Sequence, residues 1–426
     1  MIKILEFQKV TKEEIFSRVV NEVDVSCIVS EIIENVKEKK DKALYYYCEK
    51  FDKAKLSSLE VTKEEIDEAY NKVDKEFLRI LNKAAENIKK FHLKQVRDGF
   101  SIKDEDGIII GQKITPVDSA GLYVPGGTAA YPSTVLMDSI PAKIAGCKEV
   151  VIVTPPDSLG NINPVILAAA KIAGVDRIFK VGGAQAIAAL AYGTETIPKV
   201  DKIVGPGNSF VAEAKKQVFG EVSIDMIAGP SEILVIADDK SNPKFVAADM
   251  LSQAEHDKLA NAVLITDSLE FAKEVQRELE IQIPKLERKE IARCSIDNNG
   301  KIIVCDNLSQ AIDISNEIAP EHLELCVDNP FDYLDKIRHA GSIFMGRYCP
   351  EALGDYYSGT NHTLPTSGTA RFSSPLSVDD FVKKTQYTYY TKEAFKKVYK
   401  DISVFADNEG LTGHGKSALI RFEEQI

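Results

Sequence analysis

Residues 119–154 read SAGLYVPGGTAAYPSTVLMDSIPAKIAGCKEVVIVT, and this stretch decides the fold class. A short apolar run, SAGLYV, leads into a glycine-rich turn and a helical pattern, after which EVVIVT forms a second apolar run. The same sequence of features follows twice more, where RIFKV leads to GGAQAIAALAYG and DKIV leads to GPGNSFVAEAKKQV. Strands that alternate with helices predict βαβ units, whose strands pair in parallel.

A second series with the same alternation begins at SEILVIAD and continues to GSIFMG, without a residue-level repeat of the first. Upstream of both series, residues 12–93 show helical periodicity and many Lys and Glu side chains, and the segment after SSPLSVDDFVKKTQY is again charged and helical in pattern. The predicted fold is α/β, with two similar, incomplete Rossmann-like parallel-sheet domains, a helical N-terminal region and a small C-terminal helical tail. The predicted boundaries are 1–118, 119–230, 231–375 and 376–426, and the N-terminal region is expected to pack partly on the second α/β domain.

The composition is that of a soluble globular protein, with 44% hydrophobic and 28% charged residues among 426. The 65 acidic and 53 basic residues give a net charge of −12, which argues against nucleic acid or an anionic membrane as the main partner. The N-terminus reaches acidic residues too soon for a signal peptide, and no apolar stretch is long enough to span a bilayer. These features favour a cytoplasmic enzyme that acts on a small molecule.

Three glycine-rich turns each follow a predicted strand and open a predicted helix: Gly126–Gly127, Gly182–Gly183 and Gly205–Gly207. Backbone amides at such turns can bind an anionic ligand, so a dinucleotide would fit this edge of the sheet. None of the turns has the spacing G-x-G-x-x-G, and glycine is common at such turns for steric reasons alone. It is their clustering at one edge that makes a binding site plausible.

The stretch DMLSQAEHD, residues 249–257, places an amide and an imidazole three residues apart on a predicted helix, at Gln253 and His256. Side chains at i and i+3 are neighbours on a helix surface and could converge on a metal ion, although two such ligands cannot hold it alone. Glu321 and His322 are adjacent at the mouth of a predicted strand, where α/β enzymes place reacting groups, although an ordinary strand entry would look the same.

The six histidines fall into two groups. His92 and His339 lie among Lys and Arg in helical patterns, and we expect both to be solvated. The other four lie in polar, turn-rich segments, each with a carboxylate nearby, which favours functional roles over isolated surface positions. They are His256, His322, His362 and His414.

Several blocks of the sequence together resemble histidinol dehydrogenase. They are GLYVPGGTAAYPSTVLM, GGAQAIAALAYGT, VGPGNSFVAEAKKQVFG, IDMIAGPSEILVIAD, LSQAEHD, APEHLEL, GDYYSGTNHTLPTSGTARFSSPLSVDDF and EGLTGHGKSA. The resemblance extends in order from about residue 119 to the C-terminus and is highly specific, whereas residues 1 to about 100 match only in general character.

The resemblance implies one zinc ion per subunit, held by Gln253, His256, Asp355 and His414. Nitrogen and oxygen donors of this kind suit zinc, and open coordination positions can take substrate. The zinc would act mainly as a template that orients L-histidinol, whose imidazole and amine can both coordinate a metal.

The implied reaction is the last step of histidine biosynthesis, in which two molecules of NAD oxidise L-histidinol through L-histidinal to L-histidine. The resemblance gives His322 the role of proton acceptor, and Glu321 that of activating the water which adds to the aldehyde. Tyr123, Gln185 and Asn208 match the positions that bind NAD. The positions that match the substrate site are Ser231, Gln253, His256, Glu321, His322, Asp355, His362, Glu409 and His414.

The C-terminal tail contains little apolar sequence of its own and yet carries Glu409 and His414. A segment that cannot form a core must dock on another surface. In the family that the chain resembles, this segment crosses to the other subunit of a two-fold dimer and completes that subunit's site. The resemblance therefore implies a homodimer with shared active sites.

The residues themselves leave three other classes of protein open. Seven scattered cysteines, without a C-x-x-C pair, are expected to be free thiols, and a cysteine-dependent aldehyde dehydrogenase would use Cys147 or Cys349. A zinc hydrolase would need only one metal, a water and Glu321. A nucleotide-binding protein without catalysis would leave the Gln, Asp and His residues without a purpose.

Overall fold

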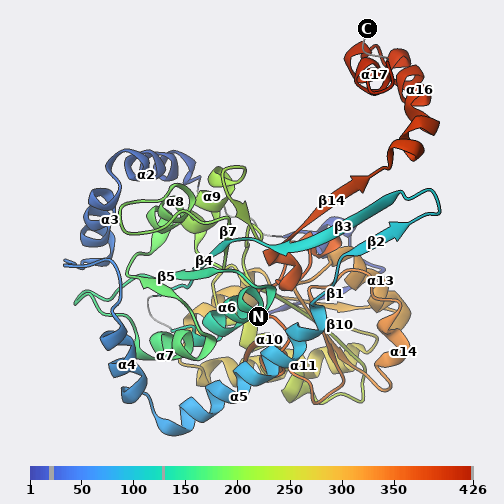
Figure 1. Ribbon diagram of the computed structural model, residues 1–426. Helices are drawn as coiled ribbons and strands as arrows, with labels where there is room; N and C mark the ends of the chain where they lie inside the picture. Colours follow the sequence, from blue (N-terminus) through green and yellow to red (C-terminus); the bar gives the residue numbers. More distant parts are fainter. Residues whose placement is uncertain (19–23, 127–129, 424–426) are drawn as a thin grey trace. The chain divides into compact units, whose positions relative to one another are not determined.

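The computed structural model describes residues 1–18, 24–126 and 130–423 (Figure 1). The chain forms two compact units. The first combines Met1–Gln95 with Val117–Phe381, and the second combines Val96–Pro116 with Val382–Ile426. Gly127, in the first predicted glycine turn, lies outside the described residues.

The first sheet confirms the alternation of strand and helix that starts at residue 119. Among the described residues it has five parallel strands in the order β6-β5-β4-β7-β8. The strands are β4 (Ser119–Tyr123), β5 (Glu149–Val153), β6 (Arg177–Phe179), β7 (Lys202–Val204) and β8 (Ser223–Ile224). The helices between them are α6 (Pro132–Ala145), α7 (Pro164–Ala173), α8 (Gly183–Tyr192) and α9 (Ser209–Val218).

Both faces of the first sheet are covered, which explains why its strands are continuously apolar. Successive residues of β5 point to opposite faces, so Val151 and Val153 enter one core while Val150 and Ile152 enter the other. The first core includes α8, α9 and two helices of the N-terminal region, and the second includes α6, α7 and two more. These N-terminal helices are α2 (Ser26–Lys39) and α3 (Asp41–Tyr47) on one face, and α4 (Lys63–Lys72) and α5 (Lys75–His92) on the other.

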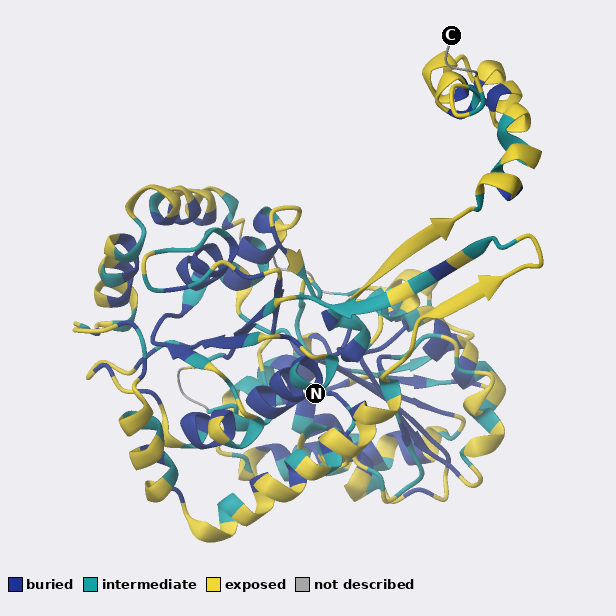
Figure 2. Cartoon of the chain, in the orientation of Figure 1, coloured by how far each residue is buried: buried dark blue, intermediate teal, exposed yellow. Residues whose placement is uncertain are grey.

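The second sheet is also parallel and has six strands within the described chain, in the order β1-β11-β10-β9-β12-β13. The strands are β9 (Glu232–Ala237), β10 (Asn261–Thr266), β11 (Lys301–Val304), β12 (His322–Cys326), β13 (Ser342–Met345) and, from the N-terminus, β1 (Lys3–Glu6). The helices are α10 (Pro243–Ala254), α11 (Leu269–Gln282), α12 (Lys289–Asn298), α13 (Leu308–Ile318), α14 (Phe331–Leu334) and α15 (Glu351–Tyr356). Figure 2 shows the central strands of both sheets as buried.

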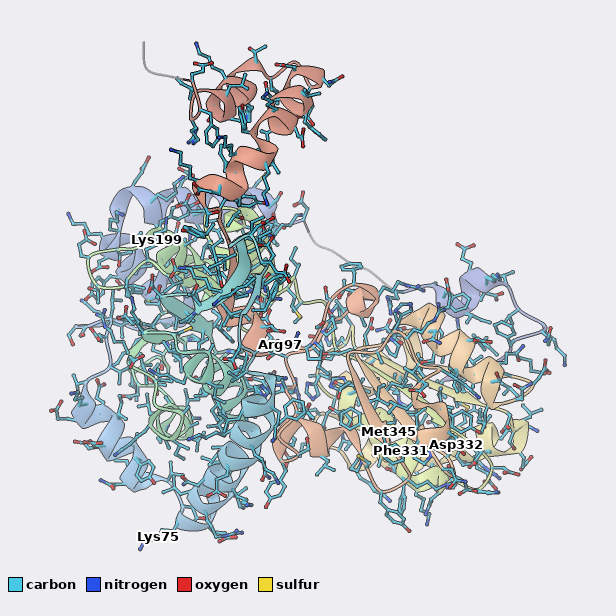
Figure 3. The ribbon with its side chains drawn as sticks, turned by 45° about the vertical axis from the view of Figure 1, so that its right-hand side comes forward. Lys75, Arg97, Lys199, Phe331, Asp332 and Met345 are labelled. Atoms are coloured by element: carbon cyan, nitrogen blue, oxygen red, sulfur yellow. The ribbon has the colours of Figure 1, made fainter. Side chains whose placement is uncertain are left out.

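The two sheets share one strand order. Numbered along the chain from β4 or from β9, each sheet reads 3-2-1-4-5, and β1 adds one further strand beside β11 in the second. This is the order of a doubly wound Rossmann sheet without its sixth strand. The structure therefore confirms two similar, incomplete Rossmann-like sheets. Figure 3 locates the carboxyl end of the second sheet through Met345, the last residue of β13.

The second unit contains an antiparallel sheet that the sequence analysis does not anticipate. In its described part, β14 (Val382–Tyr389) pairs with β3 (Ile109–Pro116), which also pairs with β2 (Phe100–Lys103). The helical tail that follows is confirmed as α16 (Lys392–Asn408) and α17 (Thr412–Leu419). Most side chains of β14 are exposed, so no buried apolar run marks it as a strand in the sequence.

Short helices complete the chain: α1 (Lys12–Phe16), the π-helix η1 (Cys48–Asp52), and the 3-10 helices η2 (Leu93–Gln95), η3 (Ile283–Lys285), η4 (Thr369–Arg371) and η5 (Val378–Phe381). None of the helices within the described ranges is long and apolar enough to cross a bilayer.

Candidate active site

Glu321 and His322 lie at the amino end of the second sheet, where β12 begins. Both side chains are buried. Glu321 lies directly before the strand, and its carbonyl accepts a hydrogen bond from the backbone of Ser342 in β13 at 2.9 Å. The pair is thus fixed by the sheet from both sides, although at the end opposite to the one that α/β enzymes usually use.

The hydrogen bonds of His322 identify its free nitrogen. Nδ1 lies 2.9 Å from the carbonyl oxygen of Glu232, and because a carbonyl only accepts, Nδ1 carries the hydrogen. Nε2 is buried and has no hydrogen-bond partner in the described chain. This nitrogen lies 3.7 Å from Oδ1 of Asp355. His322 therefore presents one nitrogen without a hydrogen-bond partner to the site.

The carboxylate of Glu321 is held by the neighbouring strand β9. Its Oε2 accepts a hydrogen bond from the backbone nitrogen of Glu232 at 2.8 Å and lies 3.7 Å from Nδ1 of His322. Burial raises the pKa of Glu321 to about 8, although His322 opposes the shift. Burial lowers the pKa of His322, but Glu321, Asp355 and Glu351 together raise it to about 10.

Gln253 and His256 approach the same place from the carboxyl end of α10. This helix follows β9 and runs back along the sheet, so its last turn reaches the amino edge. Gln253 is buried, and its Oε1 has no hydrogen-bond partner among the described residues. Burial lowers the pKa of His256, and Asp355 partly opposes this effect.

Asp355, on α15, is the acidic centre of the site. Burial alone would raise its pKa, but the nearby imidazoles of His322 and His362 lower it to about 2. The ligand atoms of His322, Glu351 and Asp355 lie within 4.8 Å of one another. An ionised carboxylate beside unpaired oxygen and nitrogen atoms is a donor set that fits a divalent cation.

His362 lies in a buried segment that packs against α6. Its Nε2 is unpaired within the described chain, and burial lowers its pKa. The residues on either side anchor the segment, because Asn361 Nδ2 donates to the carbonyl of Met137 at 2.7 Å and Thr363 Oγ1 donates to Asp138 at 2.9 Å.

The prediction that His92 is solvated is wrong. His92 is completely buried and lies 3.2 Å from Asn361 Nδ2 through its Nε2. It occupies the buried face of α5 together with Leu81, Ala84 and Ile88, so it packs against the segment that carries His362. The other histidine expected to be solvated, His339, is half-buried.

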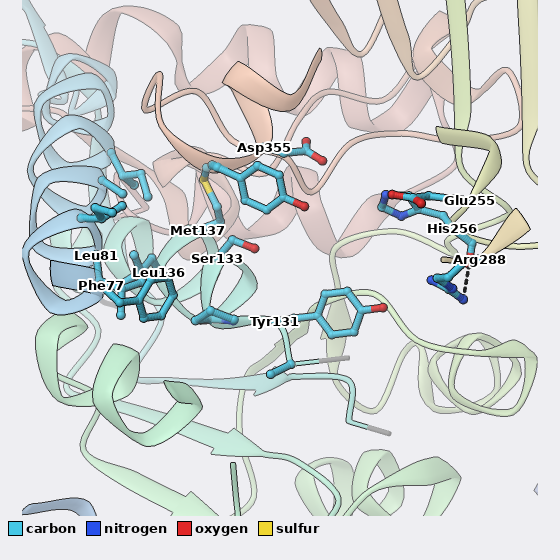
Figure 4. A pocket seen from close by; sticks show the side chains of 16 residues that line it. Phe77, Leu81, Tyr131, Ser133, Leu136, Met137, Glu255, His256, Arg288 and Asp355 are labelled. Atoms are coloured by element: carbon cyan, nitrogen blue, oxygen red, sulfur yellow. Dashed lines mark hydrogen bonds between the residues drawn. The ribbon is translucent and has the colours of Figure 1, made fainter. Parts of the chain in front are cut away.

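A cavity of about 310 Å³ opens beside this cluster (Figure 4). Phe77 and Leu81 of α5 form an apolar wall, and His256 and Asp355 lie among polar side chains that face it. Tyr131 and Ser133, at the start of α6, also line the cavity. Ser231 lies just before β9, where its carbonyl accepts from the backbone of Asn261 at 3.0 Å. The cavity therefore gives a small polar molecule access to His256 and Asp355, two of the candidate metal ligands.

Tyr123, Gln185 and Asn208 lie at the carboxyl end of the first sheet. Tyr123 ends β4, and its hydroxyl accepts from the backbone nitrogen of Gly183 at 3.1 Å. Gln185 is in the first turn of α8, and Asn208 caps α9 by accepting from two backbone nitrogens. These positions suit a ligand at the helix N-termini.

A buried ion pair between Lys215 and Asp225 holds the Gly205 turn. Lys215 Nζ donates to the carbonyl of Gly205 at 3.0 Å, and the backbone nitrogen of Gly205 donates to Asp225 at 2.8 Å. Gly205 has φ of +111°, and a Cβ there would lie 2.2 Å from the carbonyl oxygen of Tyr123. Sequence reasoning missed this pair, which no local spacing reveals.

The remaining candidates, Glu409 and His414, belong to the second unit. Glu409 follows α16, and His414 lies in α17. Both side chains are exposed.

Sequence reasoning also missed Glu351, although it precedes Asp355 by four residues on one helix and so shares its face.

The structure weakens the case for a catalytic cysteine. All seven cysteines lie in the described residues and are free thiols, as predicted. Cys147 is buried, and burial raises the pKa of its thiol to about 11, so it is a poor nucleophile at neutral pH. Cys349 is half-buried.

The fold and the site together define an α/β enzyme with two parallel sheets and a buried centre of imidazole, amide and carboxylate groups. A family model described as histidinol dehydrogenase matches residues 17–422. The chain belongs to the histidinol dehydrogenase family.

Individual relatives agree with this assignment. The chain is 58% identical to the histidinol dehydrogenase of Clostridium acetobutylicum over 392 residues, which cover 92% of this chain and 91% of the relative. It is 54% identical to that of Bacillus thuringiensis subsp. konkukian over 99% of this chain and 98% of the relative. The crystal structure of histidinol dehydrogenase from Elizabethkingia anophelis matches with a TM-score of 0.94 and 42% identity, covering 99% of this chain and 98% of that chain.

Proposed function

We propose that this chain is a zinc-dependent, NAD-linked dehydrogenase that oxidises L-histidinol through L-histidinal to L-histidine, the last step of histidine biosynthesis. One observation carries the proposal. Gln253 Oε1, His322 Nε2 and His362 Nε2 are all buried without hydrogen-bond partners in the described chain. Both histidines also interact with the ionised carboxylate of Asp355. Unpaired buried polar atoms are costly, so their grouping supports a site for a ligand.

Zinc would be held by Gln253, His256 and Asp355, with His414 as the fourth ligand. When bound, the ion would supply positive charge and orient the imidazole and amine of the substrate. Ser231, His362 and Glu409 would contact the substrate, together with the metal ligands and the catalytic pair. The cavity beside His256 and Asp355 supports this arrangement, because it admits a small molecule to the proposed ligands.

His322 would accept the hydroxyl proton through Nε2 in both half-reactions. The surrounding carboxylates raise the pKa of His322 and so favour its protonated form. Positive charge in the site would offset their effect, so that the neutral imidazole could accept a proton. Glu321 would activate the water that adds to the aldehyde. Its raised pKa makes proton exchange at neutral pH feasible.

NAD would bind across the carboxyl edge of the first sheet, at Tyr123, Gln185 and Asn208. In this division residues 119–230 bind NAD and residues 231–375 carry the metal and the catalytic pair. Residues 1–118 form a mainly helical region, and residues 376–426 reach the partner subunit. We expect the enzyme in the cytoplasm, without a nucleic-acid or membrane partner.

The proposal is tested by counting products. Purified protein is incubated with zinc, L-histidinol and NAD, and NADH absorbance and L-histidine are measured together. Two NADH for each L-histidine support the proposal. One NADH with accumulation of aldehyde, or no NADH at all, would refute it, and a zinc hydrolase would give no NADH.

We further propose a homodimer in which each site takes Glu409 and His414 from the other subunit. The second unit supports this, because it exposes large apolar side chains that a monomer would leave in water. They include Ile102, Ile110, Tyr389, Val404 and Phe405.

Complementation tests the shared sites. Inactive His256→Asn chains are mixed with inactive His414→Asn chains under conditions that allow subunit exchange. A heterodimer then has one site with both defects and one with neither, so roughly a quarter of wild-type activity should return. If the tail completes the site of its own chain, every site keeps one defect and the mixture stays inactive.

A further inference from the structure

Glu351 begins α15 and is almost completely buried, with 2% of its surface exposed. It lies one helical turn before Asp355, and the sequence resemblance assigns it no role. We propose that Glu351 is a positioning residue that turns the side-chain amide of Gln253 so that Oε1, rather than Nε2, faces the zinc site. This inference rests on the proposed function, because it concerns Gln253 as a metal ligand.

An amide side chain is nearly symmetric in shape, so its hydrogen bonds decide which end points where. Gln253 Nε2 donates to Oε1 of Glu351 at 2.9 Å, whereas Gln253 Oε1 is buried without a partner in the described residues. A reversed amide would set its oxygen against the carboxylate and its nitrogen toward the metal. The carboxylate thereby selects the orientation in which the amide can coordinate.

Among the described residues, no other contact of the amide nitrogen fixes the orientation of the amide. Gln253 Nε2 also lies 3.2 Å from Nδ1 of His322. That nitrogen donates its hydrogen to the carbonyl of Glu232, so it offers no lone pair to Gln253. The orientation of the amide therefore depends on Glu351.

Glu351 is itself held firmly in place. Ser252 Oγ donates to its second oxygen, Oε2, at 2.6 Å. Its backbone nitrogen donates to Oε1 of Glu324 at 2.7 Å. Each carboxylate oxygen thus has its own donor, so the group cannot rotate without the loss of a bond.

Residues that orient metal ligands affect affinity measurably, since their loss typically weakens binding by roughly 10- to 100-fold. Glu351→Gln should have this effect on zinc, because a second amide can donate as well as accept and no longer fixes Gln253. Glu351→Asp should act similarly, because the shorter side chain does not reach Gln253, and it provides a test if Glu351→Gln fails to fold.

The experiment measures the zinc dissociation constant of metal-free full-length protein by competition with a chromophoric chelator. Thermal unfolding of the metal-free variants checks that each is folded. The double variant Gln253→Glu/Glu351→Gln exchanges the two groups, so that the amide at 351 donates to a carboxylate at 253. It should bind zinc at least about tenfold more tightly than Glu351→Gln alone. Ser252→Ala removes one bond that holds Glu351 but leaves the Gln253 contact, so it should weaken zinc binding clearly less than Glu351→Gln does.

The outcomes separate this inference from the proposed function. Wild-type protein should bind zinc and His256→Asn should not, and failure of either would overturn the zinc site and this inference together. If both behave as expected but folded Glu351→Gln and Glu351→Asp bind zinc like the wild type, the positioning role is wrong. A double variant no better than Glu351→Gln would contradict it as well.

Discussion

The first and second sheets have the same strand order but carry their candidate functional groups at opposite ends. In the first sheet Tyr123, Gln185 and Asn208 lie at the carboxyl ends of the strands, beside glycine turns. In the second sheet Glu321 and His322 lie at the amino end of β12, beside Ser231, which precedes β9. The common strand order thus does not determine which edge carries the site.

The carboxyl edge of the second sheet is closed by ion pairs. Arg347, just after β13, donates to both oxygens of Asp238, after β9, at 2.7 and 2.8 Å. It also donates to Asp328, after β12, at 2.5 Å. These groups occupy the position between β9 and β12 where the strand order reverses and a doubly wound sheet usually binds its ligand. Because these side chains bind one another, none of the three leaves an unpaired charge at this edge for a ligand.

The largest expected effect lies at the amino edge of the second sheet. Glu321→Gln should slow oxidation of L-histidinal by roughly two to four orders of magnitude and affect L-histidinol oxidation less, because only the aldehyde step needs an activated water. His322→Asn should impair both steps. Single-turnover measurements with each substrate separate the two. Equal slowing of both steps in Glu321→Gln would show that the division of roles is incorrect.

An intermediate effect is expected at the carboxyl edge of the first sheet. Gly205→Ala places a Cβ against the carbonyl of Tyr123 at a positive φ, which strains the turn before Asn208. The KM for NAD should rise roughly tenfold or more. Zinc content should not change.

Gly220→Ala is the matched control for that variant. Gly220 has φ of +105°, but no atom of the described residues lies within 4 Å of a Cβ built there. This variant should lose stability without a change in the KM for NAD. An equal rise of KM in both variants would mean that strain anywhere in the domain, and not the Gly205 turn, controls binding of NAD.

The smallest effect on activity is expected at the carboxyl edge of the second sheet. Arg347→Met removes the ion pairs with Asp238 and Asp328, although Asp328 keeps an ion pair with Lys240 at 2.8 Å. Denaturant unfolding should show a loss of about 1–3 kcal/mol, since the group is only partly buried. KM values for NAD and L-histidinol should stay within about twofold of the wild type. A large rise in either would place a ligand at this edge.

The sequence predicted the two sheets well because their strands are short apolar runs that alternate with helical patterns, which are local signals. It did not predict that β1 joins β11 or that β14 pairs with β3, since these pairings join distant segments. The grouping of Gln253 with His256 was predicted from helical spacing, although α10 ends at Ala254 and His256 lies in the turn that follows. The same spacing would have found Glu351 beside Asp355.

The error at His92 has a physical reason. Its immediate neighbours, including Lys89 and Lys90, suggest an exposed position. Leu81, Ala84, Ile88 and His92 are nevertheless spaced by three or four residues, which places the histidine on the apolar face of α5. The periodicity of the whole helix therefore outweighs the character of adjacent residues.

The most direct test of the central claim is an anomalous-scattering measurement at the zinc absorption edge on crystals grown with zinc and NAD. The account predicts a peak at the amino edge of the second sheet, beside Gln253 Oε1 and Asp355, and NAD density at the carboxyl edge of the first sheet. A second group of possible metal ligands is formed by Asp249 of α10 and by Glu324 and Cys326 of β12. A zinc peak at that group, or at the carboxyl edge beside Arg347, would contradict the account.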